Sequence, residues 1–171
     1  MGELSKKIRS IPDFPKKGIL FRDITPLLQD SISFRRAIDL LVENYRGKDI
    51  DSVVSVEARG FILGSVLAYK LGVGFVPIRK PGKLPYKVEK VTYKLEYGED
   101  GVEIHQDAIK EGDKVLIFDD LLATGGTAKA VCELVEKLEG EIVGVSFLIE
   151  LSELKGRGKL KGYEVFSLIK Y

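Results

Sequence analysis

The chain has 171 residues, of which 44% are apolar and 31% are charged, and its formal net charge is +1. A chain of this length buries about 70% of its unfolded surface, so we expect one domain over residues 1–171 that needs no disulfide or metal to fold. The charge balance disfavours a strongly basic nucleic-acid-binding protein. The single cysteine excludes an intrachain disulfide, and the single histidine excludes a two-histidine zinc motif.

The chain contains no apolar run of 18 residues, which excludes a transmembrane helix. Its first residues are charged and lack the apolar centre of a signal peptide. We therefore expect a soluble cytoplasmic protein with no membrane partner.

Helical and strand patterns alternate along the chain. Three prolines and a glycine within residues 11–26 predict an irregular, extended start. Apolar residues at helical spacing then predict a helix over residues 34–45, with Ser33 as its N-cap. The remaining elements that we expect are helices over 61–71 and from 128, and strands over 51–56, 75–78, 114–118, 142–149 and 165–169. Strands that alternate with helices indicate a mostly parallel α/β sheet flanked by helices.

Residues 79–106 have a different pattern. Prolines and a glycine punctuate a lysine-rich stretch over 79–90, and alternation over 91–97 and 102–104 predicts a hairpin with one solvated face. A charged stretch is most often a solvated loop. The position beside a strand end also suits a mobile lid.

The segment 115–127 carries the clearest functional signal. A buried strand is followed by Asp119 and Asp120, and then by a small, glycine-rich turn over 123–127 that opens a helix. Open α/β sheets bind ligands at the carboxyl ends of their strands, and the free N–H groups of a helix start bind anions. The segment therefore predicts a site for a phosphate next to sugar hydroxyls, the alternative being a capped helix with solvated acids. It is not an ATP-binding P-loop, because no lysine precedes Thr127.

This segment, Asp-Asp-Leu-Leu-Ala-Thr-Gly-Gly-Thr at its centre, resembles the phosphoribosyl pyrophosphate (PRPP) motif of type I phosphoribosyltransferases, in particular those that use adenine. Similar segments elsewhere in the chain are 9–15, 21–24, 59–61, 82–85 and 95–98. The resemblance runs from about residue 8 to the C-terminus. It implies the type I fold, with a small N-terminal hood over about 1–33 and a β-hairpin lid over about 79–106. It also implies transfer of the 5-phosphoribosyl group from PRPP to adenine, giving AMP and pyrophosphate.

The resemblance assigns roles in PRPP binding. The residues that would bind the 5-phosphate are Ala123, Thr124, Gly125, Gly126 and Thr127. Those that would face the ribose hydroxyls are Asp119 and Asp120, and those that would bind pyrophosphate are Arg59, Lys80 and Lys83. Arg59 is also a catalytic candidate, because its guanidinium donors match phosphate oxygens. The residues before it are Glu57-Ala58, where many relatives have Asp-Ser.

The resemblance also implies a homodimer, in which the lysine matching Lys80 reaches the pyrophosphate of the neighbouring subunit. It implies Mg²⁺ bound mainly through PRPP, and no metal site made by the protein alone.

Glu96 is the second catalytic candidate, since it matches a glutamate that would take the proton from adenine N9 or stabilise positive charge on the ribose. Its alternative is ordinary exposure on a strand. The residues that would cover adenine are Leu20, Phe21, Arg22 and Leu151, of which Phe21 could instead belong to the core. His105, alone on the hairpin, is expected to be solvated.

Two other functions stay open at this point. A phosphoribosyltransferase for another purine, such as xanthine, has the same PRPP motif, although residues 21–24 favour adenine. A non-catalytic regulator that senses PRPP or a purine is the other. Such regulators carry an added DNA-binding domain, for which 171 residues leave no room, and a near-neutral charge does not favour DNA binding.

Overall fold

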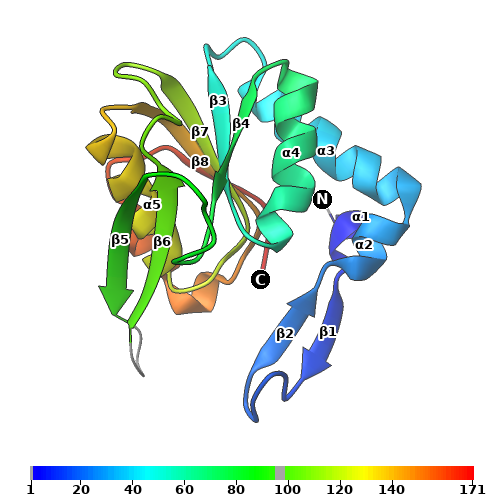
Figure 1. Cartoon of the computed structure of the whole chain (residues 1–171). Helices are drawn as coiled ribbons and strands as arrows, with labels where there is room; N and C mark the ends of the chain where they lie inside the picture. The colour runs from blue at the N-terminus through cyan, green and yellow to red at the C-terminus, as the bar shows by residue number, and fades with distance from the viewer. Residues whose placement is uncertain (1, 95–98) are drawn as a thin grey trace.

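A computed structural model describes residues 2–94 and 99–171. Its main sheet has five parallel strands in the order β4-β3-β7-β8-β9 (Figure 1). Their bounds are β3 (Ser52–Val56), β4 (Gly74–Ile78), β7 (Lys114–Leu122), β8 (Glu141–Glu150) and β9 (Val165–Lys170). The predicted parallel α/β sheet is therefore confirmed, and its order is that of a doubly wound sheet, 2-1-3-4-5.

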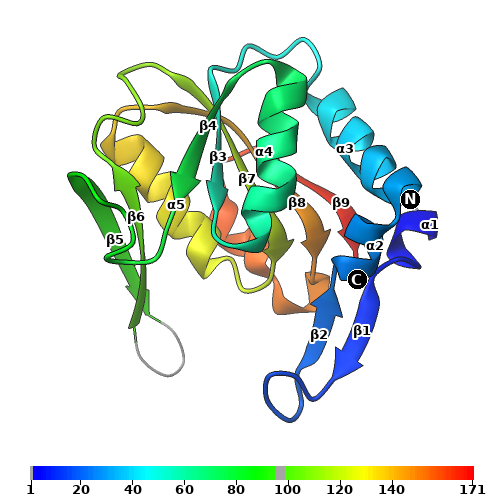
Figure 2. The ribbon, with the colours of Figure 1, turned by 45° about the vertical axis from the view of Figure 1, so that its right-hand side comes forward.

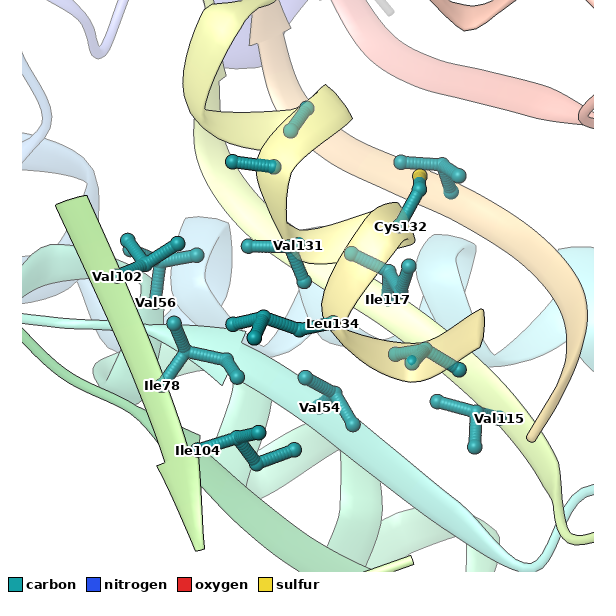
Figure 3. Packing of buried hydrophobic residues seen from close by; sticks show 14 of the residues in the cluster. Val54, Val56, Ile78, Val102, Ile104, Val115, Ile117, Val131, Cys132 and Leu134 are labelled. Atoms are coloured by element: carbon teal, nitrogen blue, oxygen red, sulfur yellow. The ribbon is translucent and has the colours of Figure 1, made fainter. Parts of the chain in front are cut away.

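Each face of the sheet is covered by its own apolar cluster. On one face lie α5 (Gly126–Lys137) and the antiparallel hairpin of β5 (Val88–Lys94) and β6 (Glu99–His105). Figure 3 shows Val131 and Leu134 of α5 packed over Val54 and Ile117 of the sheet. On the other face lie α3 (Ser31–Tyr45) and α4 (Arg59–Leu71). Burial of both faces explains why the strands are nearly continuous apolar runs.

The N-terminal segment is more regular than the sequence predicts. After α1 (Gly2–Ser5), β1 (Arg9–Pro12) pairs with β2 (Leu20–Asp23) in an antiparallel hairpin, and α2 (Thr25–Gln29) follows. The expectation of an irregular, extended start over 11–26 is confirmed for the two extended strands and for the turn over 13–19, and was wrong for Thr25 and Pro26, which begin α2. Pro12 ends β1, and Pro26 lies in the first turn of α2, where no N–H is needed.

Some element boundaries also differ from the prediction. The cap of α3 is Asp30, whose carboxylate accepts the Ser33 N–H at 2.7 Å, so the assignment of Ser33 as N-cap was wrong. Gly72 ends α4 in the left-handed conformation with φ 74°, as a glycine C-cap requires. Strand β7 continues to Leu122 because its pairing with β8 continues, so Asp119 and Asp120 lie inside the strand and not after it. The short helices η1 (Ser152–Leu154) and η2 (Gly156–Leu160) follow β8 and were not expected.

The two hairpins extend past the same edge of the sheet. Figures 1 and 2 show β1–β2 on one side and β5–β6 on the other, with the turn between β7 and α5 between them. This edge holds the carboxyl ends of the strands, which is where a parallel sheet binds its ligands.

Candidate active site

The candidate site lies where the strand order reverses, between β3 and β7. The helix after β3 is α4, on one face of the sheet, and the helix after β7 is α5, on the other. The two connecting segments therefore diverge and leave room at the sheet edge for a ligand. The sequence-predicted residues lie around these two segments: Arg59 begins α4, and 119–127 run from the end of β7 into the start of α5.

The turn after β7 forms a small cavity. It has a volume of about 70 Å³ and is lined by Asp119 and residues 121–128. Gly125, the N-cap of α5, has φ 77°, and within the described residues no side chain caps this helix. The first N–H groups of α5 are consequently available to an anion. The structure thus brings together the five residues predicted to bind a phosphate.

Gly156, the first residue of η2, packs against this turn and was not expected to do so from the sequence. A Cβ on Gly125 would lie 2.4 Å from the Gly156 carbonyl oxygen, and a Cβ on Gly156 would lie 2.1 Å from the Ala123 carbonyl oxygen. The two backbones are therefore packed directly against each other, which fixes the shape of the turn. No local pattern indicates this contact, because the two segments are far apart in the sequence.

Asp119 and Asp120 form a buried acidic pair. Burial raises the pKa of Asp119, and the neighbouring Asp120 raises it further. Burial also raises the pKa of Asp120, although the guanidinium of Arg59 opposes this, with Nη2 2.6 Å from the Asp120 Oδ2. A Cβ on Gly60 would lie 2.8 Å from the Asp119 Oδ1, so the Arg-Gly pair at 59–60 allows α4 to start directly against the acids.

Arg59 joins this acidic pair to the hood. Besides its contact with Asp120, its Nη1 donates to the Arg22 carbonyl oxygen at 3.1 Å, and its guanidinium carbon lies 4.9 Å from the centre of the Phe21 ring. One arginine therefore touches both the predicted ribose site and the predicted base site.

The other predicted adenine residues lie around this contact. Phe21 is partly exposed and packs edge-on against Phe14 at 5.0 Å, so it is not part of either core cluster. Leu20 is exposed at the start of β2. Leu151 lies at the end of β8, where its N–H donates to the Leu122 carbonyl oxygen at 2.9 Å. This contact is next to the turn over 123–127 that is predicted to bind a phosphate, called the phosphate turn below.

Glu57, two residues before Arg59, organises the start of the lid. Its carboxylate is only 8% exposed and accepts hydrogen bonds from the Arg79 Nε and the Lys80 N–H, both at 2.8 Å, and lies 3.2 Å from the Lys83 Nζ. Burial alone would raise the pKa of Glu57, but these donors outweigh it and hold the pKa below its usual value. Sequence reasoning noted Glu57 only as a departure from the family pattern.

A second buried carboxylate holds the same segment. Glu103 of β6 accepts the Gly82 N–H at 2.9 Å, and its backbone exchanges two hydrogen bonds with Arg79. Lys83 is thus brought to Glu57 in the loop after β3, while its predicted role in binding pyrophosphate stays a prediction. Lys80 instead pairs with Asp100 at the start of β6.

Two further predictions concern the hairpin. Glu96 lies outside the described residues. His105 is only partly exposed, and its Nε2 is buried without a hydrogen-bond partner among the described residues, beside the Tyr86 ring at 6.1 Å. The expectation that His105 is solvated was therefore wrong for this ring nitrogen, because Tyr86 packs edge-on against the imidazole.

Among residues 2–94 and 99–171, no three His, Cys, Asp or Glu side chains come together in a way that could hold a metal ion. In the same residues, no helix is long and apolar enough to cross a membrane.

The geometry defines a doubly wound α/β protein with an uncapped, glycine-rich helix start and a buried acidic pair at its switch point. The family model described as "Phosphoribosyl transferase domain" matches residues 25–170, and the chain belongs to this family. It is 60% identical over 167 residues to the adenine phosphoribosyltransferase of Halothermothrix orenii, covering 98% of both chains. It is also 60% identical to that of Geotalea daltonii over 171 residues, covering 100% of both. The crystal structure of adenine phosphoribosyltransferase from Thermoanaerobacter pseudethanolicus matches with a TM-score of 0.97 and 54% identity over 99% of both chains.

Proposed function

We propose that this chain is an enzyme that transfers the 5-phosphoribosyl group from PRPP to adenine, giving AMP and pyrophosphate. The observation that carries the proposal is the contact of Arg59 with both Asp120 and the Arg22 backbone, beside the phosphate turn. The residues assigned to the sugar phosphate and those assigned to the base lie around this one cation, which supports the proposal. The adenine phosphoribosyltransferases to which the chain is similar support the choice of adenine.

The proposed roles follow the order of the ligand's groups. The turn over 123–127 binds the 5-phosphate through N–H groups and threonine hydroxyls, and Asp119 and Asp120 accept from the ribose hydroxyls. Arg59, Lys80 and Lys83 bind the pyrophosphate. Carboxylates suit this site for a second reason: the transition state has oxocarbenium character, so negative charge close to the ribose stabilises it.

In the reaction, the bond between C1 of the ribose and adenine N9 forms while the bond from C1 to the pyrophosphate oxygen breaks. Pyrophosphate leaves with the bonding electrons, and N9 loses its proton. We assign Glu96 as the acceptor of this proton or as the group that stabilises charge on the ribose. For adenine, Leu20, Phe21 and Leu151 supply apolar cover, and the backbone at Leu20 and Arg22 supplies hydrogen bonds.

We include Mg²⁺ in the proposal. The oxygens of Asp119 and Asp120, beside the turn over 123–127, are suitable donors to this ion. Mg²⁺ is usually held by one or two carboxylates together with substrate phosphates and water. These residues therefore fit an ion that is bound mainly through PRPP. When bound, it neutralises charge on the pyrophosphate.

We further propose that the enzyme is a cytoplasmic homodimer. Ile62 and Tyr69 lie seven positions apart on one face of α4 and are 43% and 82% exposed, which suits an interface with a second copy. To test whether Lys80 acts in the neighbouring subunit, the Lys80→Ala protein is mixed with an Asp119→Ala/Asp120→Ala protein. Recovery of activity after subunit exchange supports action across the interface. No recovery after verified exchange places Lys80 in its own subunit's site or outside the site.

The decisive test of the function is a rate assay with PRPP, Mg²⁺ and each purine base in turn. We expect adenine to give AMP and pyrophosphate at a rate well above those of hypoxanthine, guanine and xanthine. Preference for another base would contradict the assignment of adenine. Tight PRPP binding without turnover on any base would indicate a sensor in place of an enzyme.

A further inference from the structure

A continuous chain of polar contacts joins the start of the lid to the phosphate turn. The Lys80 ammonium pairs with the Asp100 Oδ2. The same oxygen accepts the Tyr93 hydroxyl at 3.1 Å, and the Tyr93 hydroxyl lies 2.9 Å from the Thr127 Oγ1. Tyr93 of β5 therefore stands between an acid of β6 and the first turn of α5.

The chemistry of these groups fixes the direction of each hydrogen bond. Burial would raise the pKa of Asp100, but its donors, of which Lys80 is the largest, lower it, so the carboxylate only accepts. Tyr93 has one hydroxyl proton and must donate it to Asp100. Thr127 must then donate a hydrogen bond to the Tyr93 oxygen. This bond fixes the position of the Thr127 side chain, and with it the lone pairs of the Oγ1, before any ligand binds.

Packing holds the chain of contacts in place. The ring of Tyr93 lies against the phosphate turn, since a Cβ on Gly126 would be 3.5 Å from its Cδ2. The other Asp100 oxygen accepts the Gly101 N–H at 2.8 Å. A Cβ on Gly101 would be 3.2 Å from Pro81, so the start of the lid packs directly on the hairpin at this point.

We propose that Tyr93, oriented by Asp100, is a positioning residue for PRPP: it holds the Thr127 hydroxyl where the 5-phosphate binds. This inference rests on the proposed assignment of the turn to that phosphate. When a phosphate oxygen accepts a hydrogen bond from the Thr127 hydroxyl, the Tyr93 hydroxyl redirects its own hydrogen bond from Asp100 to the Thr127 Oγ1. The Thr127 hydroxyl then accepts one hydrogen bond while it donates another, and Asp100 is left to Lys80. A side chain whose oxygen is already held in place loses less conformational freedom on binding, even though its hydroxyl proton is redirected.

The test is a double-mutant cycle with Tyr93→Phe and Thr127→Val, read as the PRPP dissociation constant by calorimetry. We expect Tyr93→Phe alone to weaken PRPP binding about 3- to 10-fold, the size of one hydrogen bond. In the Thr127→Val background the same substitution should change the affinity by less than about twofold. If Thr127→Val does not fold, Thr127→Ala takes its place.

Two further readouts separate positioning from a general structural effect. Ribose 5-phosphate, which lacks the pyrophosphate, should lose affinity by the same factor as PRPP, and kcat at saturating PRPP should change less than about twofold. Tyr163→Phe is the matched control, because the Tyr163 hydroxyl also donates to a carboxylate, Glu136 at 2.6 Å, but on the exposed side of α5. It should leave PRPP affinity unchanged.

The proposal is overturned if Tyr93→Phe binds PRPP like the wild type, or if its effect multiplies fully with that of Thr127→Val. Because calorimetry needs no turnover, a protein that binds PRPP but forms no AMP contradicts the proposed function and leaves this inference to be judged by the cycle alone.

Discussion

Adding one methyl group at each of two adjacent glycines should give opposite results. Gly125 combines φ 77° with a backbone oxygen 2.4 Å from the position of a Cβ, whereas Gly126 has an ordinary helical φ and its nearest neighbour at 3.5 Å. Gly125→Ala therefore strains the native backbone. Gly126→Ala does not, but it places the methyl group between the phosphate turn and the Tyr93 ring, where the ligand must approach the N–H groups.

The magnitudes follow from these contacts. A left-handed conformation costs an alanine roughly 1–2 kcal/mol, and relieving the backbone contact brings the expected loss for Gly125→Ala to about 2–4 kcal/mol. For a chain of this size the Tm then falls by roughly 5–15 °C. For Gly126→Ala we expect a Tm within about 2 °C of the wild type, since alanine favours a helix over glycine. Loss of one hydrogen bond to a charged group weakens PRPP binding about 10- to 150-fold.

The assay combines thermal unfolding of the substrate-free proteins with calorimetric titration of PRPP. Gly126→Val, which adds more bulk at the same position, should weaken binding further. The reasoning would be refuted by a Gly126→Val protein that folds and binds PRPP with wild-type affinity. A Gly125→Ala protein as stable as the wild type would show that the contact with Gly156 does not constrain the turn.

Three other predictions concern the acids. Glu57→Gln should lower stability at pH 7 by roughly 1–3 kcal/mol. The folded pKa of Glu57 is depressed, so the stability that its charge contributes is present above the unfolded pKa and is lost as pH falls. The Tm difference from the wild type should therefore shrink toward pH 3. Equal Tm values at pH 7 would contradict this. Asp119→Asn should behave in the opposite way. Because the folded pKa of Asp119 is raised, the wild type loses stability as pH rises above the unfolded pKa, by at most about 1.4 kcal/mol per pH unit. The variant should therefore be more stable than the wild type at pH 7 while binding PRPP poorly. A variant less stable than the wild type at pH 7 would show that the Asp119 charge is not a burden on the fold. Glu96→Gln should slow the single-turnover rate about 10²–10⁴-fold with little change in PRPP or adenine affinity, and a rate within a factor of about two would make Glu96 structural.

The sequence predicts the sheet well because burial on both faces leaves a local signal, the short apolar runs between helices. It also locates the turn over 123–127, to which we assign the phosphate, since a glycine-rich turn after a buried strand is a local feature. The hydrogen bonds by which Glu57 and Glu103 hold the start of the lid leave no such local signal in the sequence. Each of these carboxylates meets donors that are distant in the sequence, and only the folded backbone brings them together. The same holds for Gly156 beneath the turn.

Strand β7 shows how a local pattern can mislead. The change from apolar residues to Asp119 and Asp120 suggests that the strand ends at Phe118. The strand continues because the backbone pairing with β8 does not depend on side-chain polarity, and Arg59 pairs with the second of the two acids.

The two apolar clusters on opposite faces of the sheet have a consequence for how the protein can change. The hood helices α1 and α2 pack into the cluster of α3 and α4, and the β5–β6 hairpin packs into the cluster of α5. The hood assigned to the base and the hairpin that holds Lys80 are therefore supported by separate sets of buried residues. A substitution that loosens one cluster should alter the KM for one substrate and leave the KM for the other unchanged. Base preference can therefore change between relatives while PRPP binding is kept. Arg59 is the exception, because it touches both the hood and the acidic pair, so a substitution at this position should affect both substrates.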